Sequence, residues 1–221
     1  MADSIPRHSP VLVTGAKGFV GSVLVRQLLQ SGFTNIRCFA RTSAGNEKLT
    51  EAARAFPDAD VQILTGNLLS TEDCWRAAAG AALVYHLAAG TGKSFAGCVL
   101  DSVVATRNLL DAAAGNASLK RFVNVGSFSV YSNCALPRGG LLDESCPVER
   151  AYIERFDAYA YAKLKQDDVV MAYGADRGIP YTILRPGIVF GPGRAGSISS
   201  HSASSWSVIG FQSAIVPAVG R

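Results

Sequence analysis

The chain has 221 residues, of which 48% are hydrophobic and 17% are charged, a balance that indicates a globular protein and excludes a disordered one. Its net charge of +4 comes without a dense Lys/Arg run, no apolar run reaches the length of a membrane span, and the N-terminus lacks an apolar signal segment, so we expect no nucleic-acid or membrane partner. The five cysteines are scattered without a C-x-x-C pair, which argues against a zinc site and a secreted disulfide framework and predicts reduced thiols in a cytoplasmic protein without a metal site.

The first predicted element is a short buried strand at Val11–Val13. Apolar residues at helical spacing from Val20 to Leu28 then predict a helix, and Gly32 stands where such a helix commonly ends. A strand that enters a helix through a tight turn collects unpaired N–H groups at one point, and the helix dipole makes that point attractive to anions.

The turn between these elements carries Gly15, Gly18 and Gly21. We expect Gly15 to allow the tight turn, Gly18 to let a pyrophosphate approach the backbone, and Gly21 to let the helix pack closely on the strand. The spacing is G-x-x-G-x-x-G rather than the usual G-x-G-x-x-G, and a purely structural turn is the alternative. The position between a strand and a helix favours nucleotide binding.

A second strand is predicted at Asn35–Ala40. In a dinucleotide-binding fold an acidic residue near this point binds the ribose 2′-hydroxyl, yet neither Asp nor Glu occurs between Asn35 and Asn46. Ala40 takes the place of the acid and Arg41 follows it. A guanidinium there can pair with the 2′-phosphate of NADP, and a solvated surface arginine is the alternative.

The rest of the chain alternates strands and helices as far as Gly193. Strands are predicted at 61–64, 82–87, 121–125 and 181–184, and helices at 47–56, 98–114 and 157–177, with a further short helix capped by Ser70 or Thr71 and ending at Gly80. This alternation predicts an α/β fold, a doubly wound Rossmann-type parallel sheet with helices on both faces. His86 lies inside an apolar strand, and we expect it to be a structural residue rather than a catalytic base.

Two residues of the last predicted helix, Tyr159 and Lys163, are four apart and share one face. A nearby ammonium lowers the pKa of a phenol, so Tyr159 would exchange a proton with a substrate hydroxyl or carbonyl while a nicotinamide exchanges a hydride. Ser127, just after the fifth strand, would polarise the same oxygen from the carboxyl edge of the sheet. Y-x-x-x-K also arises by chance on a solvated helix, but the order of glycine turn, serine and tyrosine–lysine favours catalysis.

Several longer motifs stand in sequence between residues 14 and 193. They are TGAKGFVG at Thr14–Gly21, VYHLAA at Val84–Ala89, NLLDAA at Asn108–Ala113, FVNVGSFSVY at Phe122–Tyr131, DESCP at Asp143–Pro147, YAYAK at Tyr159–Lys163 and LRPGIVFGPG at Leu184–Gly193. Together they resemble the extended short-chain dehydrogenase/reductase superfamily, the NAD(P)-dependent epimerase/dehydratase group.

The resemblance implies a role for each matching residue. Ser127, Tyr159 and Lys163 match the catalytic trio. Backbone contacts to the pyrophosphate would come from Phe19 and Val20, Asn67 and Leu68 would flank the adenine, Leu87 to Ala89 would line the nucleoside, and Pro186 would lie by the nicotinamide. The cofactor-binding set is thus Gly15, Gly18, Phe19, Val20, Gly21, Arg41, Asn67, Leu68, Leu87, Ala88, Ala89, Tyr159, Lys163 and Pro186.

The chain departs from the family pattern at three positions and in length. Asn67 stands where the family usually has Asp, Ser102 where many members have Asn, and Ala40 replaces the acid that selects NAD. The match fades after Gly193, whereas family members continue and build a substrate-binding lobe. We therefore expect residues 1–193 to form an NAD(P)-binding Rossmann-like domain and residues 194–221 to form a serine-rich irregular tail, a remnant of that lobe.

These features imply NAD(P)-dependent oxidoreductase, epimerase or dehydratase chemistry, in which hydride transfer at a hydroxyl or carbonyl of a nucleotide sugar or small carbonyl substrate is paired with tyrosine as acid/base. NADP is the expected cofactor and NAD is the alternative. A non-catalytic NAD(P)-binding sensor or scaffold is the second hypothesis. Helices 98–114 and 157–177 either form a homodimer interface, as in the family, or simply pack on the sheet.

Overall fold

Six parallel strands form one sheet in the computed structural model, which describes residues 5–91, 94–134, 136–137, 139–152 and 157–191. The strand order is β3-β2-β1-β4-β5-β6, so the chain winds outward in both directions from the centre and the predicted doubly wound sheet is confirmed. The strands are β1 (Val11–Thr14), β2 (Asn35–Ala40), β3 (Asp60–Thr65), β4 (Leu83–His86), β5 (Arg121–Val125) and β6 (Tyr181–Leu184). The predicted tail, residues 194–221, lies outside the described residues.

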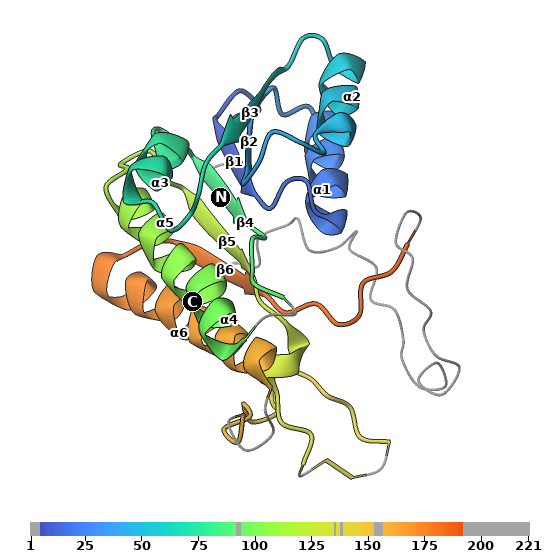
Figure 1. The fold of residues 1–221 in the computed structure, drawn as a ribbon, viewed down its shortest axis with the longest axis vertical. Coiled ribbons are helices and arrows are strands. Elements are labelled where there is room, and N and C mark those ends of the chain that lie inside the picture. The colour runs from blue at the N-terminus through green and yellow to red at the C-terminus, as the bar shows by residue number, and fades with distance from the viewer. Residues whose placement is uncertain (1–4, 92–93, 135, 138, 153–156, 192–221) are drawn as a thin grey trace.

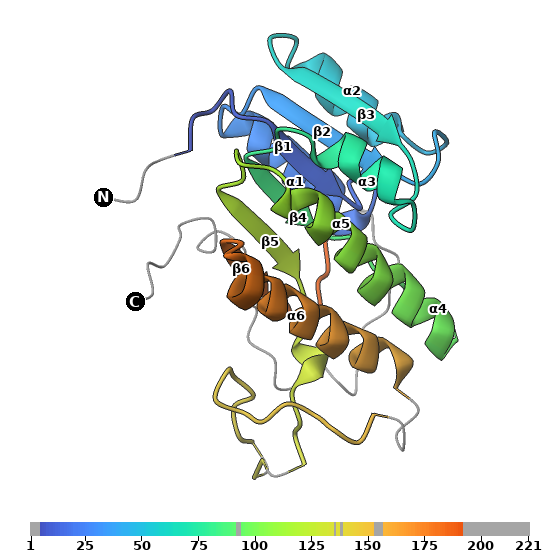
Figure 2. The ribbon, with the colours of Figure 1, turned by 90° about the vertical axis from the view of Figure 1, so that its left-hand side faces the viewer.

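Helices cover both faces of this sheet (Figure 1). They are α1 (Phe19–Gln30), α2 (Glu47–Ala55), α3 (Thr71–Ala78), α4 (Phe95–Val99), α5 (Ala105–Ala114) and α6 (Ala158–Arg177), with a π-helical segment η1 (Leu100–Val104) and a 3-10 turn η2 (Phe128–Val130). One face carries α1 and α2, and the other carries α3, α5 and α6. Figure 2 shows the α4–η1–α5 segment running beside α6.

Alternation along the strands produces one hydrophobic core on each face. Val11 and Val13 pack with residues of α1 and α2 such as Val25, whereas Leu12 between them packs with residues of α5 and α6 such as Leu109 and Val170. All four β1 residues are fully buried. A strand buried on both sides is expected to be apolar, as Val11–Val13 is, and the polar Thr14 stands at its end.

Polar caps and glycines set the helix ends. Ser70 caps α3 by accepting a hydrogen bond from the Asp73 N–H, and Asp157 caps α6 by accepting one from the Ala160 N–H. Gly178 ends α6 in the left-handed region with φ +66°. The predicted start and stop signals of these helices are confirmed.

The helix expected at 98–114 differs most from its prediction. It begins earlier, at Phe95, because the Ser94 hydroxyl caps the Gly97 N–H. Its middle turn is π-helical, and there Ser102 accepts a hydrogen bond from the Gly90 N–H at 3.0 Å through its hydroxyl and one from the Thr106 hydroxyl through its carbonyl. Side chains that compete for backbone groups in this way loosen the regular helical ladder.

Candidate active site

The turn between β1 and α1 brings backbone segments closer than side chains would allow. A Cβ at Gly15, where φ is +68°, would lie 2.9 Å from the Ala88 nitrogen. One at Gly21 would lie 2.2 Å from the Gly15 oxygen. The structure thus gives Gly15 and Gly21 the steric roles expected from the sequence.

The start of α1 is built from backbone alone. Gly18 is exposed and is the N-cap of the helix, with no side-chain cap and no acidic residue in the first turn. The predicted phosphate contacts, Phe19 and Val20, form that first turn. An uncapped helix start that carries no acid has N–H groups and a positive dipole end available to an anion.

Arg41 follows the carboxyl end of β2, as predicted, but its guanidinium has a protein partner. Its Nη2 lies 3.3 Å from a carboxylate oxygen of Asp101 in η1. The Arg41 side chain is 63% exposed and that of Asp101 only 11%. The arginine is therefore neither fully solvated nor isolated.

Lys17 was not singled out from the sequence. Its Nζ donates to the Thr42 carbonyl at 2.9 Å and the Thr42 hydroxyl at 3.0 Å, and also to the Ala44 carbonyl. The lysine thereby ties the glycine turn to the loop that follows Arg41. Its position inside the glycine motif was the available signal.

The residues expected around the adenine are engaged locally. Asn67 donates its N–H to Asp73 at 2.8 Å and accepts the Leu69 N–H at 3.0 Å through its side chain. Leu68 is buried in the core beside α5, and its carbonyl accepts from Asn108. The Asn67 side chain thus shapes its own loop.

The ends of β1 and β4 are tied together at the carboxyl edge of the sheet. The Leu87 N–H donates to the Thr14 carbonyl at 3.2 Å, and the Ala88 N–H donates to the Thr14 hydroxyl at 3.3 Å. The Pro186 carbonyl accepts from the Phe128 N–H at 3.1 Å. Ala89 directly follows this paired segment. The predicted nucleoside and nicotinamide residues therefore follow β4 and β6, which lie on either side of β5, at one edge of the sheet.

Ser127 and Tyr159 meet at the end of β5. Ser127 caps η2 and accepts the Ser129 hydroxyl at 2.9 Å. A hydrogen bond with Ser127 lowers the pKa of Tyr159, but burial outweighs it and raises that pKa above its usual value. The net shift is opposite to the expected lowering by Lys163, because burial is the largest cause and the ammonium donates its hydrogen bonds to Val125 and Gln166 rather than to the phenol.

Lys163 points toward the end of β5 and into the protein. Its Nζ donates to the Val125 carbonyl at 2.7 Å and to the Gln166 side-chain oxygen at 2.9 Å. Burial lowers the pKa of Lys163 to about 8, against the opposing effect of Asp167. The structure therefore brings Ser127, Tyr159 and Lys163 to one strand end.

His86 is a structural residue, as predicted from its apolar strand. It is fully buried, with Nδ1 2.7 Å from the Thr14 hydroxyl and Nε2 2.8 Å from the Thr106 hydroxyl. Burial lowers the pKa of His86 to about 3, helped by the charge of Lys163. The imidazole is neutral at physiological pH.

A second buried cluster supports the same region and was not predicted. Asp167 is fully buried and accepts from Asn124 at 2.9 Å and from Arg185 at 2.9 Å. Arg185 also donates to the Tyr131 hydroxyl at 2.7 Å. Burial nevertheless raises the pKa of Asp167.

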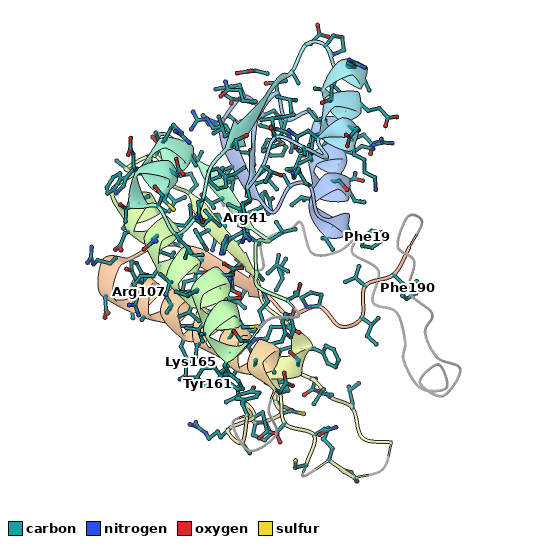
Figure 3. The ribbon with its side chains drawn as sticks, viewed as in Figure 1. Phe19, Arg41, Arg107, Tyr161, Lys165 and Phe190 are labelled. Atoms are coloured by element: carbon teal, nitrogen blue, oxygen red, sulfur yellow. The ribbon has the colours of Figure 1, made fainter. Side chains whose placement is uncertain are left out.

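Two hollows differ in their position relative to Ser127 and Tyr159. A cavity of about 160 Å³ adjoins these two residues, because Ser129 in its lining hydrogen-bonds to Ser127 and Asp157 in its lining caps the helix that carries Tyr159. The cavity is lined by Phe128, Ser129, Tyr131, Asn133, Leu142 and Asp157. A larger hollow of about 400 Å³ lies between η1–α5 and α6, and no predicted catalytic residue lines it. Figure 3 shows Arg107, Tyr161 and Lys165 together along this second hollow, away from Phe19.

Within the described ranges, no three His, Cys, Asp or Glu side chains gather as a metal site would require. No helix in that part of the chain combines the length and apolarity needed to cross a membrane. The five cysteines are thiols that form no disulfide with one another.

Comparison with known proteins gives a family match and several similar enzymes. The family model for the NAD dependent epimerase/dehydratase family matches residues 11–208. Cinnamoyl-CoA reductase 1 of Oryza sativa subsp. japonica is 28% identical over 82% of this chain and 54% of the reductase. A 3 beta-hydroxysteroid dehydrogenase/Delta 5-->4-isomerase of Mycobacterium tuberculosis is 31% identical over 83% of this chain and 48% of that enzyme.

Among solved structures, UDP-glucuronic acid 4-epimerase from Bacillus cereus, crystallised in complex with NAD, matches with a TM-score of 0.64 and 27% identity. The match covers 83% of this chain and 58% of the epimerase. The chain thus spans about half the length of the curated relatives it matches.

Proposed function

The chain belongs to the NAD dependent epimerase/dehydratase family, and we propose that it binds a nicotinamide dinucleotide and carries out hydride transfer at a hydroxyl or carbonyl group. The observation that carries this proposal is the convergence of Ser127, Tyr159 and Lys163 at the end of β5. The edge that holds them is also the edge at which the glycine turn meets Ala88. Ligands of doubly wound sheets bind at this edge.

The glycine turn supports the cofactor half of the proposal. The exposed N-cap at Gly18 and the uncapped first turn of α1 suit a pyrophosphate, because backbone N–H groups and the helix dipole stabilise its charge. Gly15 and Gly21 keep that turn tight against β4 and α1. The residues present therefore fit a dinucleotide.

We assign NADP as the preferred cofactor and NAD as the alternative. No acid stands at the end of β2 to bind a ribose 2′-hydroxyl, and Arg41 stands there instead. Lys17 adds a second cation beside the same loop. Both would stabilise a 2′-phosphate, and Asp101 is the group that the phosphate would displace from Arg41.

In the proposed mechanism the chain's own residues handle the proton. The nicotinamide, when bound, supplies or accepts the hydride. Ser127 holds the reacting oxygen, and Tyr159 donates a proton to it or takes one from it. Because burial raises the pKa of Tyr159, the phenol is protonated at neutral pH and is ready to act as an acid, which favours carbonyl reduction. Lys163 supplies positive charge that favours the phenolate when the reaction runs the other way.

The substrate class is a nucleotide sugar or a small carbonyl compound. The cavity beside η2 supports a substrate with both polar and aromatic contacts, since Ser129, Asn133 and Tyr131 line it. An epimerase and a cinnamoyl-CoA reductase among the similar proteins represent the two possibilities. We place the reaction in the cytoplasm, in keeping with the free thiols.

A binding titration against NADPH and NADH tests the proposal, with Gly18→Asp as the control variant. We expect tight NADPH binding that the added carboxylate abolishes, since it would repel a pyrophosphate at the helix start. A preference for NADH would discard the role of Arg41. Binding of neither cofactor would contradict the proposal.

A second function is favoured by the raised pKa of Tyr159 and by the direction of the Lys163 ammonium toward the Val125 carbonyl. The chain would then be a non-catalytic NAD(P)-binding sensor or scaffold. This function predicts that the chain binds the cofactor but turns over no hydroxyl or carbonyl substrate. Replacing Tyr159 would then change nothing measurable, in contrast to the enzyme proposal.

We also propose that a second copy of the chain covers the hollow between η1–α5 and α6. Its lining includes Val99 and Val103, and exposed Leu100 and Met171 lie on the same helices. Sedimentation velocity would show a dimer, and a charged residue at Val103 would convert it to a monomer.

A further inference from the structure

The ammonium of Lys163 is held by two neutral acceptors. The Val125 carbonyl accepts at 2.7 Å and the Gln166 side-chain oxygen at 2.9 Å. Lys163 is 3% exposed and Gln166 is fully buried. An ammonium has three N–H groups, and within the described residues two of them donate to protein acceptors.

The Gln166 amide is itself held from its other side. Its nitrogen donates to the Thr106 hydroxyl at 2.8 Å. Because an ammonium only donates, the amide oxygen must face Lys163 and the amide nitrogen must face Thr106. The orientation of Gln166 is thus determined by the charge that it holds.

This polarity continues through the buried core. The Thr106 hydroxyl accepts from Gln166 and donates to the Ser102 carbonyl, so it must also accept from His86 Nε2. His86 Nδ1 then accepts from the Thr14 hydroxyl at 2.7 Å. Four side chains of this network are fully buried: Thr14, His86, Thr106 and Gln166. One chain of hydrogen bonds therefore links Lys163 to the residue before the glycine turn.

We propose that Gln166 is the positioning residue for Lys163, which it fixes at the Val125 carbonyl without supplying an opposite charge, so that the described residues use two of the three N–H groups of the ammonium. The proposal rests on the catalytic role proposed above for Lys163. A carboxylate at this position would hold the ammonium as well but would neutralise it. The amide of Gln166 holds it without supplying an opposite charge, so the charge stays available to Tyr159 and to a ligand.

Other groups near Lys163 set the background for a test. Asp167 on the same helix raises the pKa of Lys163, and Arg185 beyond β6 pairs with Asp167. His86 on β4 is neutral, and Tyr159 lies one turn earlier on α6. The nearby polar groups of β5 and η1–α5, which include Asn124, Ser102 and Thr106, are uncharged.

The test is a pH titration of the ¹⁵N-lysine-labelled full chain without cofactor, followed by NMR at Nζ. The Lys163 signal is assigned by its loss in Lys163→Met. We expect a midpoint near pH 8 in the unmodified chain. In Gln166→Met, which keeps the bulk but loses the amide, the midpoint should fall by about one pH unit, since a hydrogen bond to a charged group is lost.

Gln166→Glu is the second variant and should move the midpoint in the opposite direction, upward by about one pH unit or more, because it adds a negative charge. It decides the question alone where Gln166→Met does not fold. Asp176→Asn is the matched control: Asp176 is exposed near the end of α6, away from Lys163, and the loss of its charge should leave the Lys163 midpoint unchanged. Equal midpoints in the unmodified chain and the folded Gln166 variants would overturn the proposal.

A cofactor titration on the same proteins separates this inference from the proposed function. We expect Gln166→Met to weaken NADPH or NADH binding about tenfold, because Lys163 is no longer fixed. If the unmodified chain binds neither cofactor while the Lys163 midpoints still shift, the tether stands and the proposed function fails. If the unmodified chain binds a cofactor but the midpoints coincide, cofactor binding stands and the proposed role of Gln166 fails.

Discussion

Two regions at the carboxyl edge of the sheet are built by different means. The glycine turn after β1 depends on the absence of side chains: a Cβ at Gly15 or Gly21 would meet backbone atoms. The cluster after β5 depends on buried side chains, with Lys163 held by Gln166 and Asp167 held by Arg185.

The difference decides how each region fails. Backbone atoms cannot move aside for an added methyl group, so the glycine turn should lose packing as soon as a side chain is present. Buried side chains hold one another through hydrogen bonds, so the cluster should lose function or pH response while the fold survives. The predictions below test these two regions, the buried His86 and the ion pair of Arg41.

The largest effect is expected from Tyr159→Phe. Loss of the hydroxyl removes the proposed acid/base, so turnover should fall by roughly 10²–10⁴-fold while cofactor affinity changes little. Steady-state rates and a cofactor titration check both halves. Tyr161→Phe is the control, because Tyr161 lines the outer hollow. Turnover that survives in Tyr159→Phe would refute the mechanism.

Gly21→Ala should produce the next largest effect, on stability. The new Cβ would stand 2.2 Å from the Gly15 oxygen, so the free energy of unfolding should fall by about 1–3 kcal/mol or more. Urea unfolding measures it. Gly187 is exposed, and a Cβ there would approach only the Phe128 ring, at 3.9 Å, so Gly187→Ala should be nearly neutral. Equal losses in both variants would show that the close approach at Gly21 is not what matters.

The third prediction concerns acid and the buried His86. Its pKa in the folded chain is about 3, below the usual value of 6.5, so the unfolded chain binds more protons between these values. The contribution of neutral His86 to the free energy of unfolding is fully present above pH 6.5. It is lost as the pH falls toward 3, by at most about 1.4 kcal/mol per pH unit. Unfolding measured between pH 7 and 4 should show a flatter pH dependence in His86→Gln. Identical slopes would contradict a neutral, buried imidazole.

Much of the glycine turn and the sheet could be predicted because their signals are local. Gly15, Gly18 and Gly21 lie within seven residues of sequence and between two periodic segments. The parallel sheet with helices on both faces follows from the alternation of strands and helices. The position of Ser127 at the end of β5 follows in the same way.

The buried cluster could not be predicted because its contacts are distant in sequence. Gln166 bonds to Thr106 and His86 bonds to Thr14 across 60 and 72 residues. No pattern in the sequence separates these polar residues from solvated ones. The direction of the Tyr159 pKa shift could not be predicted for a related reason. Spacing places Lys163 on the same helix face as Tyr159, but it does not reveal that the Val125 carbonyl accepts a hydrogen bond from the Lys163 ammonium.

The smallest effect should come from Asp101→Asn, which tests the ion pair that joins the β2 edge to η1. Arg41 is mostly exposed, so the pair itself contributes little, and its loss should raise NADPH affinity by no more than about fivefold while NADH affinity stays constant. Parallel titrations of both cofactors at two salt concentrations measure the change, which should shrink at the higher concentration. Asp176→Asn removes an exposed carboxylate elsewhere and controls for net charge. If both variants alter NADPH binding equally, the effect is general electrostatics; if Asp101→Asn improves NADH binding as well, Asp101 does not compete with a 2′-phosphate for Arg41.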